Sequence, residues 1–206
     1  MIFWLAAQAQ QENNYVMVMV QHKKSLNLAR NLSDFQNLAD SFERIARAET
    51  HQWHPLYYAA LCYINMSIVN EKPESSQDYL DQAQVLIDRA LKIYPDESEL
   101  FVLQALLYQG RIRADQTGQG REFLIRAGTA LDKAKSFNPD NPRIYYLMGL
   151  NLLFLPEAAG GGAVVACPMF ITATEKFGKE QPSHVLSPTW GGERNEQFLT
   201  QYCKNR

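Results

Sequence analysis

Residues 87–96 read IDRALKIYPD and residues 131–140 read LDKAKSFNPD, so the chain contains nearly the same segment twice, 44 residues apart. When the sequence is aligned with itself at this offset, the match extends well beyond the two segments. Apolar residues align with apolar residues, and small residues align with small ones. The matched pairs include Leu80 with Leu124, Ala83 with Ala127, Ile87 with Leu131, Ala90 with Ala134, and Pro95 with Pro139. A match of this length indicates an internal repeat, which has to be recognised before any shorter motif is interpreted.

Each copy has the pattern of one helix followed by another. Leu80, Ala83, Ile87, Ala90 and Tyr94 recur at spacings of three and four, which places them on one helical face. The proline that follows lacks the amide that a continuing helix needs, so it ends one helix or opens the next. A helix pair of this kind cannot bury its apolar face alone. The prediction is therefore an all-α protein built of stacked helix pairs.

The small and aromatic positions of these pairs resemble the tetratricopeptide repeat. In that pattern a small residue and an aromatic residue on the first helix precede Ala-x3-[aromatic or aliphatic]-x2-Ala and Pro on the second. The first repeat, 54–95, carries Ala60, Tyr63, Ala83, Ile87, Ala90 and Pro95. The second, 98–139, carries Ala105, Tyr108, Ala127, Leu131, Ala134 and Pro139. The third, 142–178, carries Gly149, Leu152, Ala166, Phe170 and Ala173, with Gly178 in place of the proline.

The resemblance implies a right-handed α–α superhelix, a tetratricopeptide-like solenoid with a C-terminal capping tail. Residues 10–178 form its repeat domain, beginning with a degenerate helix pair near 15–31 and 34–49, and residues 179–206 are a C-terminal extension. The period of 44 residues exceeds the usual length of about 34. The extra residues lie near 70–77 and 113–120, and they predict longer helices or projecting loops.

Residues 1–9 resemble the remnant of a signal peptide. An apolar run from Ile2 to Ala7 precedes Ala7-Gln8-Ala9, the small-x-small pattern of a signal peptidase site. The run is short and no Lys or Arg precedes it, so a frayed apolar tail is the alternative. The favoured interpretation is an exported, periplasmic protein, with a cytoplasmic one as the alternative. No later stretch is long and apolar enough to span a bilayer, although peripheral association with the cell envelope stays open.

Composition argues against several classes of partner and site. The net charge of −2 offers no electrostatic reason to bind nucleic acid. Cys62, Cys167 and Cys203 are scattered and match neither a disulfide framework nor a zinc spacing, so they are interpreted as packed or free thiols, with a structural bridge as the less favoured alternative. His51 and His54, in HQWH, lack a third ligand at metal-site spacing and are assigned capping and packing roles. No cofactor and no metal are expected.

The loop LPEAAGGGA, residues 155–163, is the one glycine-dense stretch. Because it lacks the preceding strand and the Lys-Ser/Thr of a phosphate-binding loop, it predicts a tight reversal with positive φ angles rather than an anion site. No nucleophile elbow, paired-carboxylate motif or Cys–His signature is present. The chain is therefore not expected to be an enzyme.

In tetratricopeptide arrays the first helix of each repeat lines a concave groove, and this resemblance implies the candidate binding residues. They are Tyr57, Leu61, Ile64, Asn65, Val102, Leu106, Gln109, Tyr146, Leu150 and Leu153. Chaperone-binding members of the family clamp a terminal carboxylate with Lys and Asn on this wall. Here His54, Glu99 and Arg143 occupy the early turns, so the carboxylate clamp is rejected.

An open apolar groove needs a ligand or a cover. The C-terminal stretch with Val185, Leu186 and Trp190, followed by a helix from Glu193 to Lys204, either fills the groove or caps the last repeat. The sequence resembles exported bacterial tetratricopeptide proteins, which implies a non-enzymatic adaptor or scaffold of the bacterial cell envelope that binds a protein or peptide. The alternative is a carrier that holds a small molecule or lipid in the groove.

Overall fold

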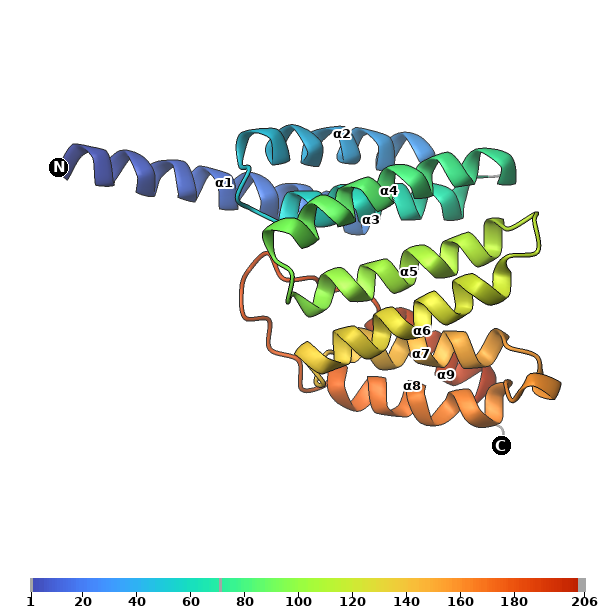
Figure 1. The fold of residues 1–206 in the computed structure, drawn as a ribbon. Helices are drawn as coiled ribbons and strands as arrows, with labels where there is room; N and C mark the ends of the chain where they lie inside the picture. Colours follow the sequence, from blue (N-terminus) through green and yellow to red (C-terminus); the bar gives the residue numbers. More distant parts are fainter. Residues whose placement is uncertain (1, 71, 204–206) are drawn as a thin grey trace. The chain divides into compact units, whose positions relative to one another are not determined.

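All regular secondary structure in the described part of the chain is helical, which confirms the predicted fold class at that level. The computed structural model describes residues 2–70 and 72–203 (Figure 1). It divides into two compact units. Unit 1 is Met1–Pro95 with His184–Ser187, and unit 2 is Asp96–Ser183 with Pro188–Arg206. The boundary at residue 95 falls between the first and second repeats.

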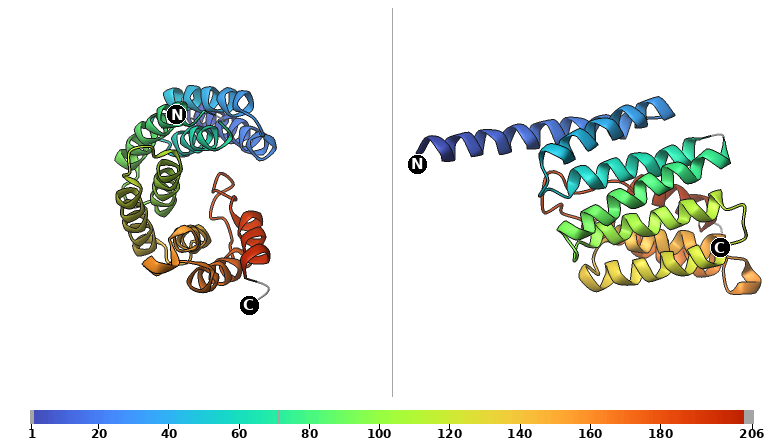
Figure 2. Two further views of the ribbon diagram at one scale, coloured as in Figure 1. Left: turned by 90° about the vertical axis from the view of Figure 1, so that its right-hand side faces the viewer. Right: turned by 45° about the horizontal axis from the view of Figure 1, so that its top comes forward.

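The repeat of 44 residues recurs in the positions at which the helices begin and end. The first helices of the three pairs begin at His54, Ser98 and Pro142, each 44 residues after the last. The two helices of each pair lie side by side (Figures 1 and 2). The pairs are α3 (His54–Val69) with α4 (Pro73–Ile93), α5 (Ser98–Ala114) with α6 (Gly120–Phe137), and α7 (Pro142–Phe154) with α8 (Ala163–Phe177). Long helices absorb most of the residues by which the repeat exceeds the usual length.

Two further helices open unit 1, close to the predicted degenerate pair. They are α1 (Ile2–Leu28) and α2 (Leu32–Ala48). The side chain of Asn31 caps α2 by accepting a hydrogen bond from the Asp34 amide at 3.0 Å. Helix α1 includes residues 2–9 of the predicted signal-peptide remnant, Met1 lies outside the described residues, and export stays a prediction. No helix in the described ranges has an apolar run long enough to cross a membrane.

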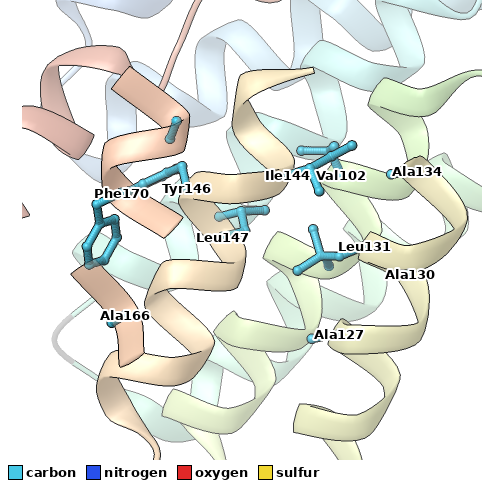
Figure 3. Packing of buried hydrophobic residues seen from close by; sticks show 12 residues of the cluster. Val102, Ala127, Ala130, Leu131, Ala134, Ile144, Tyr146, Leu147, Ala166 and Phe170 are labelled. Atoms are coloured by element: carbon cyan, nitrogen blue, oxygen red, sulfur yellow. The ribbon is translucent and has the colours of Figure 1, made fainter. Parts of the chain in front are cut away.

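The small and aliphatic positions of the repeat form the contact between the two helices of each pair. Those on the second helices are inaccessible to solvent in all three repeats: Ala83, Ile87 and Ala90; Ala127, Leu131 and Ala134; Ala166, Phe170 and Ala173. Figure 3 shows this packing in unit 2, where Leu131, Leu147 and Phe170 lie in one buried cluster. Because alanine carries only a methyl group, the helices approach closely along these residues.

Gly149 is a small residue on α7 that faces the Phe170 ring of α8. A Cβ atom built at Gly149 would lie 2.5 Å from the ring of Phe170, which is itself fully buried. The pattern predicted a small residue here, and the geometry explains why alanine is already too large.

The glycine-dense loop between α7 and α8 is a tight reversal, as predicted. Gly160 and Gly162 have φ angles of 85° and 96°, values that favour glycine. At Gly161 a Cβ would meet the backbone oxygen of Leu155. These glycines are needed for the turn itself, which removes the reason to assign them a ligand.

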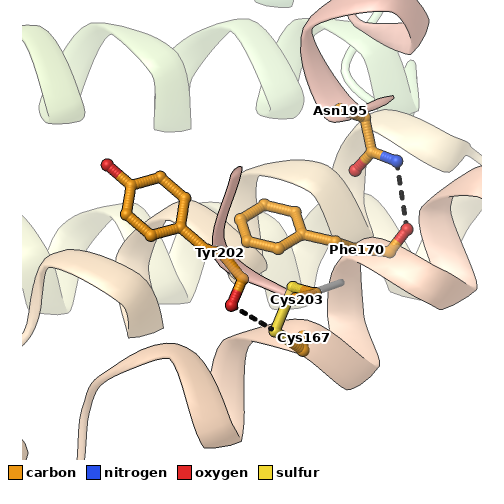
Figure 4. Close-up of a disulfide and its surroundings, with 5 residues drawn as sticks. All are labelled: Cys167, Phe170, Asn195, Tyr202 and Cys203. Carbon is orange, nitrogen blue, oxygen red and sulfur yellow. Dashed lines mark hydrogen bonds between the residues drawn. A yellow bond between two sulfur atoms is a disulfide. The ribbon is translucent and has the colours of Figure 1, made fainter. Parts of the chain in front are cut away.

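Helix α9 (Gly192–Tyr202) packs on α8, close to the closing helix predicted for 193–204; Lys204 lies outside the described residues. The prediction of packed or free thiols is wrong for two cysteines. Cys167 on α8 and Cys203 after α9 form a disulfide (Figure 4). Their separation of 36 residues matches no spacing rule, and they meet only because α9 folds back onto α8. Cys62 is free and buried, as predicted.

We expect Gly149→Ala to destabilise unit 2 by about 1–3 kcal/mol, because the added methyl group overpacks the core against Phe170. Urea unfolding followed by circular dichroism measures the change. Gly128→Ala is the matched control, since a Cβ there meets nothing within 4 Å. It should leave stability unchanged or raise it by up to about 1 kcal/mol through helix propensity. A neutral Gly149→Ala would contradict the close approach of α7 and α8.

Loss of the disulfide should destabilise unit 2 by roughly 4 kcal/mol, the loop-closure entropy of a segment of this length. The double variant Cys167→Ser/Cys203→Ser and the reduced wild-type chain should unfold at similarly lowered urea concentrations. Reductant should have no effect on the double variant. Equal stability of the oxidised and reduced wild-type chains would mean that the bridge does not form.

Candidate functional site

The predicted groove residues lie on α3 in unit 1 and on α5 and α7 in unit 2. Those on α3 are Tyr57, Leu61, Ile64 and Asn65; those in unit 2 are Val102, Leu106, Gln109, Tyr146, Leu150 and Leu153. Tyr57, Leu61, Ile64, Val102 and Tyr146 are buried, and the others are partly exposed. Gln109 donates hydrogen bonds to the Leu147 carbonyl at 3.0 Å and to Asn151 at 2.7 Å. The buried members of the set pack within their own units, and the role of these residues in binding stays a prediction.

Two of the charged residues predicted for the groove wall belong to a buried ion network in unit 2. Arg143 is fully buried, and its guanidinium donates to Glu99 at 3.1 Å, to Glu180, and to the Pro188 carbonyl at 2.6 Å. It also lies over the rings of Phe177 and Trp190. Burial raises the pKa of the Glu99 carboxyl, and the Arg143 charge opposes that rise. The named partners of Arg143 all belong to unit 2, whereas its buried Nε atom has no hydrogen-bond partner.

At the start of α3 in unit 1, aromatic rings pack together in place of an ion network. Pro55 occupies the first turn, where a missing amide costs nothing, so the helix begins at His54 directly after Trp53. The His54 imidazole stacks on the Trp53 indole with ring centroids 4.0 Å apart. Trp53 in turn contacts Tyr57 and Tyr94. The packing role predicted for His54 is confirmed, whereas His51 is exposed to solvent.

Residues 184–187 form a tight turn beside His54. The Ser187 amide donates to the His184 carbonyl at 2.9 Å, and the Leu186 amide donates to His184 Nδ1 at 3.1 Å. Leu186 is fully buried in unit 1. The imidazole rings of His184 and His54 lie 5.4 Å apart. We call this segment the 184–187 turn.

Three successive carbonyl groups hold the 184–187 turn in unit 1. Lys23 on α1 donates to the carbonyls of Val185, at 3.1 Å, and Ser187. The Tyr58 hydroxyl on α3 donates to the Leu186 carbonyl at 2.7 Å. The turn therefore docks through one buried leucine and its own backbone, while the Val185 side chain remains exposed.

His54 is neutral and incompletely hydrogen-bonded in this setting. Burial, followed by the neighbouring His184 and Lys23, lowers the pKa of His54 from 6.5 to about 4. Its Nδ1 atom is buried and has no hydrogen-bond partner. A buried polar atom without a hydrogen-bond partner costs about 1–3 kcal/mol.

Tyr15 on α1 carries a second such atom, because its buried hydroxyl also has no hydrogen-bond partner. Burial raises the pKa of Tyr15, with further contributions from Glu49 and Tyr94. Tyr15 thus stays a protonated phenol, while His54 stays a neutral base. Both lie in unit 1, and Tyr94 contacts Trp53, the residue that stacks on His54.

Within residues 2–70 and 72–203, no three His, Cys, Asp or Glu side chains gather closely enough to hold a metal. The sequence analysis considered His54 only together with His51, three residues away. His184 was missed because no spacing rule links it to His54; the only available signal was the pair of apolar anchors, Val185 and Leu186, beside it.

Lowering the pH should reduce the stability of unit 1, because protonation of His54 favours the unfolded chain. Because the folded protein binds this proton more weakly than the unfolded chain, stability present at pH 7 is lost as pH falls from 6.5 towards 4. Between pH 7 and pH 5 the wild type should lose up to about 2 kcal/mol more than His54→Gln, which has no such proton to bind. Urea unfolding at both pH values measures this difference. Equal losses in both proteins would show that His54 titrates normally.

Comparison with known proteins gives one informative result. No family model matches the chain, and no curated protein matches it. A solved structure, the HusA haemophore from Porphyromonas gingivalis, is similar with a TM-score of 0.82 and 25% sequence identity. The similarity covers 93% of this chain and 95% of that chain, so it extends over nearly the full length of both.

Proposed function

We propose that the chain is a carrier of haem, or of a closely related flat tetrapyrrole. The similarity to a haemophore over 93% of the chain is the observation that carries this proposal. It favours the small-molecule carrier over the peptide-binding adaptor and over an enzyme. The helix pairs, with their buried small residues and starts 44 residues apart, are in this proposal a tetratricopeptide-like scaffold for binding.

The chemistry around His54 is compatible with such a ligand. In haem the porphyrin supplies four nitrogen ligands, so a protein needs to contribute only one or two, and histidine is a common choice. The absence of a three-residue metal cluster in the described ranges is therefore no obstacle. Aromatic rings such as Trp53 suit the flat apolar macrocycle, and a cation such as Lys23 suits its carboxylate groups.

Export forms part of the proposal. Disulfides persist in oxidising compartments and are rare in the cytosol, so the bridge between Cys167 and Cys203 supports a location outside the cytoplasm. The signal-peptidase pattern Ala7-Gln8-Ala9 points in the same direction. A haem carrier acting outside the cytoplasm unites both features.

The purified, oxidised chain should bind ferric haem at neutral pH with a Kd of about 1 µM or below, corresponding to a binding free energy of about −8 kcal/mol. Titration followed by the Soret absorbance measures the affinity and stoichiometry. Metal-free protoporphyrin IX, followed by quenching of tryptophan fluorescence, tests recognition of the macrocycle itself.

The same chain unfolded in urea serves as the control, because haem adheres to exposed apolar surface without specific recognition. Saturable binding should be lost on unfolding. If the folded chain binds neither haem nor protoporphyrin IX more tightly than the unfolded chain does, the carrier proposal is wrong.

A further inference from the structure

We infer that the bound macrocycle lies on an aromatic surface of unit 2, and that Arg194 binds one of its carboxylate groups. This surface consists of Phe154 on α7 and of Arg194, Phe198 and Tyr202 on α9, and we call it the aromatic strip. The inference rests on the proposed function and goes beyond it, since carriage of a tetrapyrrole does not specify where the ligand lies.

The rings of the aromatic strip are continuous with one another and with the core of unit 2. Phe198 and Tyr202 lie one helical turn apart, and their rings stack with centroids 5.9 Å apart. Phe198 also stacks on the buried ring of Phe170 at 5.7 Å. The Phe154 ring meets Phe198 edge-on at 6.3 Å. The buried cluster of unit 2 therefore extends outward through these rings to the surface.

Phe154 is the ring through which the aromatic strip meets solvent. It is 70% exposed, whereas Trp53 in unit 1 is buried. A single exposed apolar side chain is ordinary, but Phe154 continues a set of contacting rings. Leu150 and Leu153, two of the predicted groove residues on α7, are partly exposed beside it in the sequence. A flat apolar ligand can thus reach an aromatic ring here without displacing any segment of the chain.

Arg194 supplies a positive charge next to these rings. Its guanidinium lies 5.9 Å from the centroid of the Phe198 ring and donates to Gln197 at 3.0 Å, and the side chain is exposed. The acidic neighbour Glu196 is engaged elsewhere, since it accepts from the Thr174 hydroxyl of α8 at 2.7 Å. A cation beside stacked rings complements a macrocycle that is flat and apolar but carries carboxylate groups.

Helix α9 is attached to α8 near both of its ends, which fixes the aromatic strip in advance of binding (Figure 4). In its first turn, Asn195 donates to the Phe170 carbonyl at 3.0 Å and to the Thr174 hydroxyl at 2.8 Å. After its last turn, Cys203 is joined to Cys167 by the disulfide. A surface that is already ordered loses less conformational entropy when a ligand binds.

The test is a titration of the oxidised full-length chain with protoporphyrin IX. Phe154→Ala should weaken binding about fivefold, the effect of one aromatic contact. Arg194→Gln should weaken it about threefold, whereas Arg194→Lys keeps the charge and should retain the affinity. Ile125→Ala and Arg121→Gln are the matched controls: both residues are exposed on α6 in the same unit and should have no effect.

Protoporphyrin IX dimethyl ester, which has no free carboxylate, separates the two contacts. The wild-type chain and Arg194→Gln should bind the ester equally, whereas Phe154→Ala should still bind it more weakly. Urea midpoints equal to that of the wild type should show that these exposed substitutions preserve the fold. If Phe154→Ala lowers the midpoint, Phe154→Leu replaces it, because leucine removes the ring and keeps an apolar side chain.

Unchanged porphyrin affinity in the Phe154 variant overturns the aromatic strip. It does so equally if sedimentation shows that the wild-type chain self-associates through Phe154, which would assign the exposed ring to a second copy of the chain. The same loss for acid and ester in Arg194→Gln overturns the carboxylate contact. Failure of the wild-type chain to bind either porphyrin would instead overturn the proposed function.

Discussion

The close contact of the two helices in each pair is the constraint on which the rest of the structure depends. It requires a small residue wherever the backbones approach, and Ala83, Ala127 and Ala166 provide one in successive repeats. At Gly149 even a methyl group is excluded by the Phe170 ring. Since these contacts lock the helices in register, they also determine which side chains face the core. The repeated segments are scaffold, and recognition has to come from residues outside them.

The core of unit 2 contains a buried arginine, Arg143, that the repeat pattern does not explain. An unpaired arginine in a core is strongly unfavourable. Removing one partner of a buried ion pair therefore typically costs about 3–5 kcal/mol, because it leaves the other charge unpaired. Arg143 is stabilised by Glu99 from α5 and by Glu180 and Pro188 from the C-terminal extension. The extension is therefore part of the core of unit 2 rather than an appendage. This arrangement also accounts for charged residues on a wall that lacks a carboxylate clamp.

The sequence was sufficient to predict features that depend on local pattern. The all-helical fold class, the buried residues of the repeats and the glycine reversal at 155–163 follow from periodicity and backbone conformation, and the structure confirms them. The Cys167–Cys203 bridge and the contact of His184 with His54 could not be predicted in the same way. Each joins a helix to the C-terminal extension, whose folding back is determined by tertiary packing. The superhelical arrangement of the repeats remains a prediction.

The departures from the repeat pattern are where function is best sought. A tetratricopeptide-like scaffold specifies packing and leaves the ligand open, which is why its resemblance alone favoured a generic peptide adaptor. His54 and Trp53 lie at the start of the first repeat, outside its repeated buried positions, and the 184–187 turn that contacts His54 belongs to no repeat. Within these four residues, Leu186 is fully buried and three carbonyl groups accept hydrogen bonds from side chains of unit 1. His54, whose buried Nδ1 atom has no hydrogen-bond partner, therefore lies beside a segment that the repeat pattern does not predict.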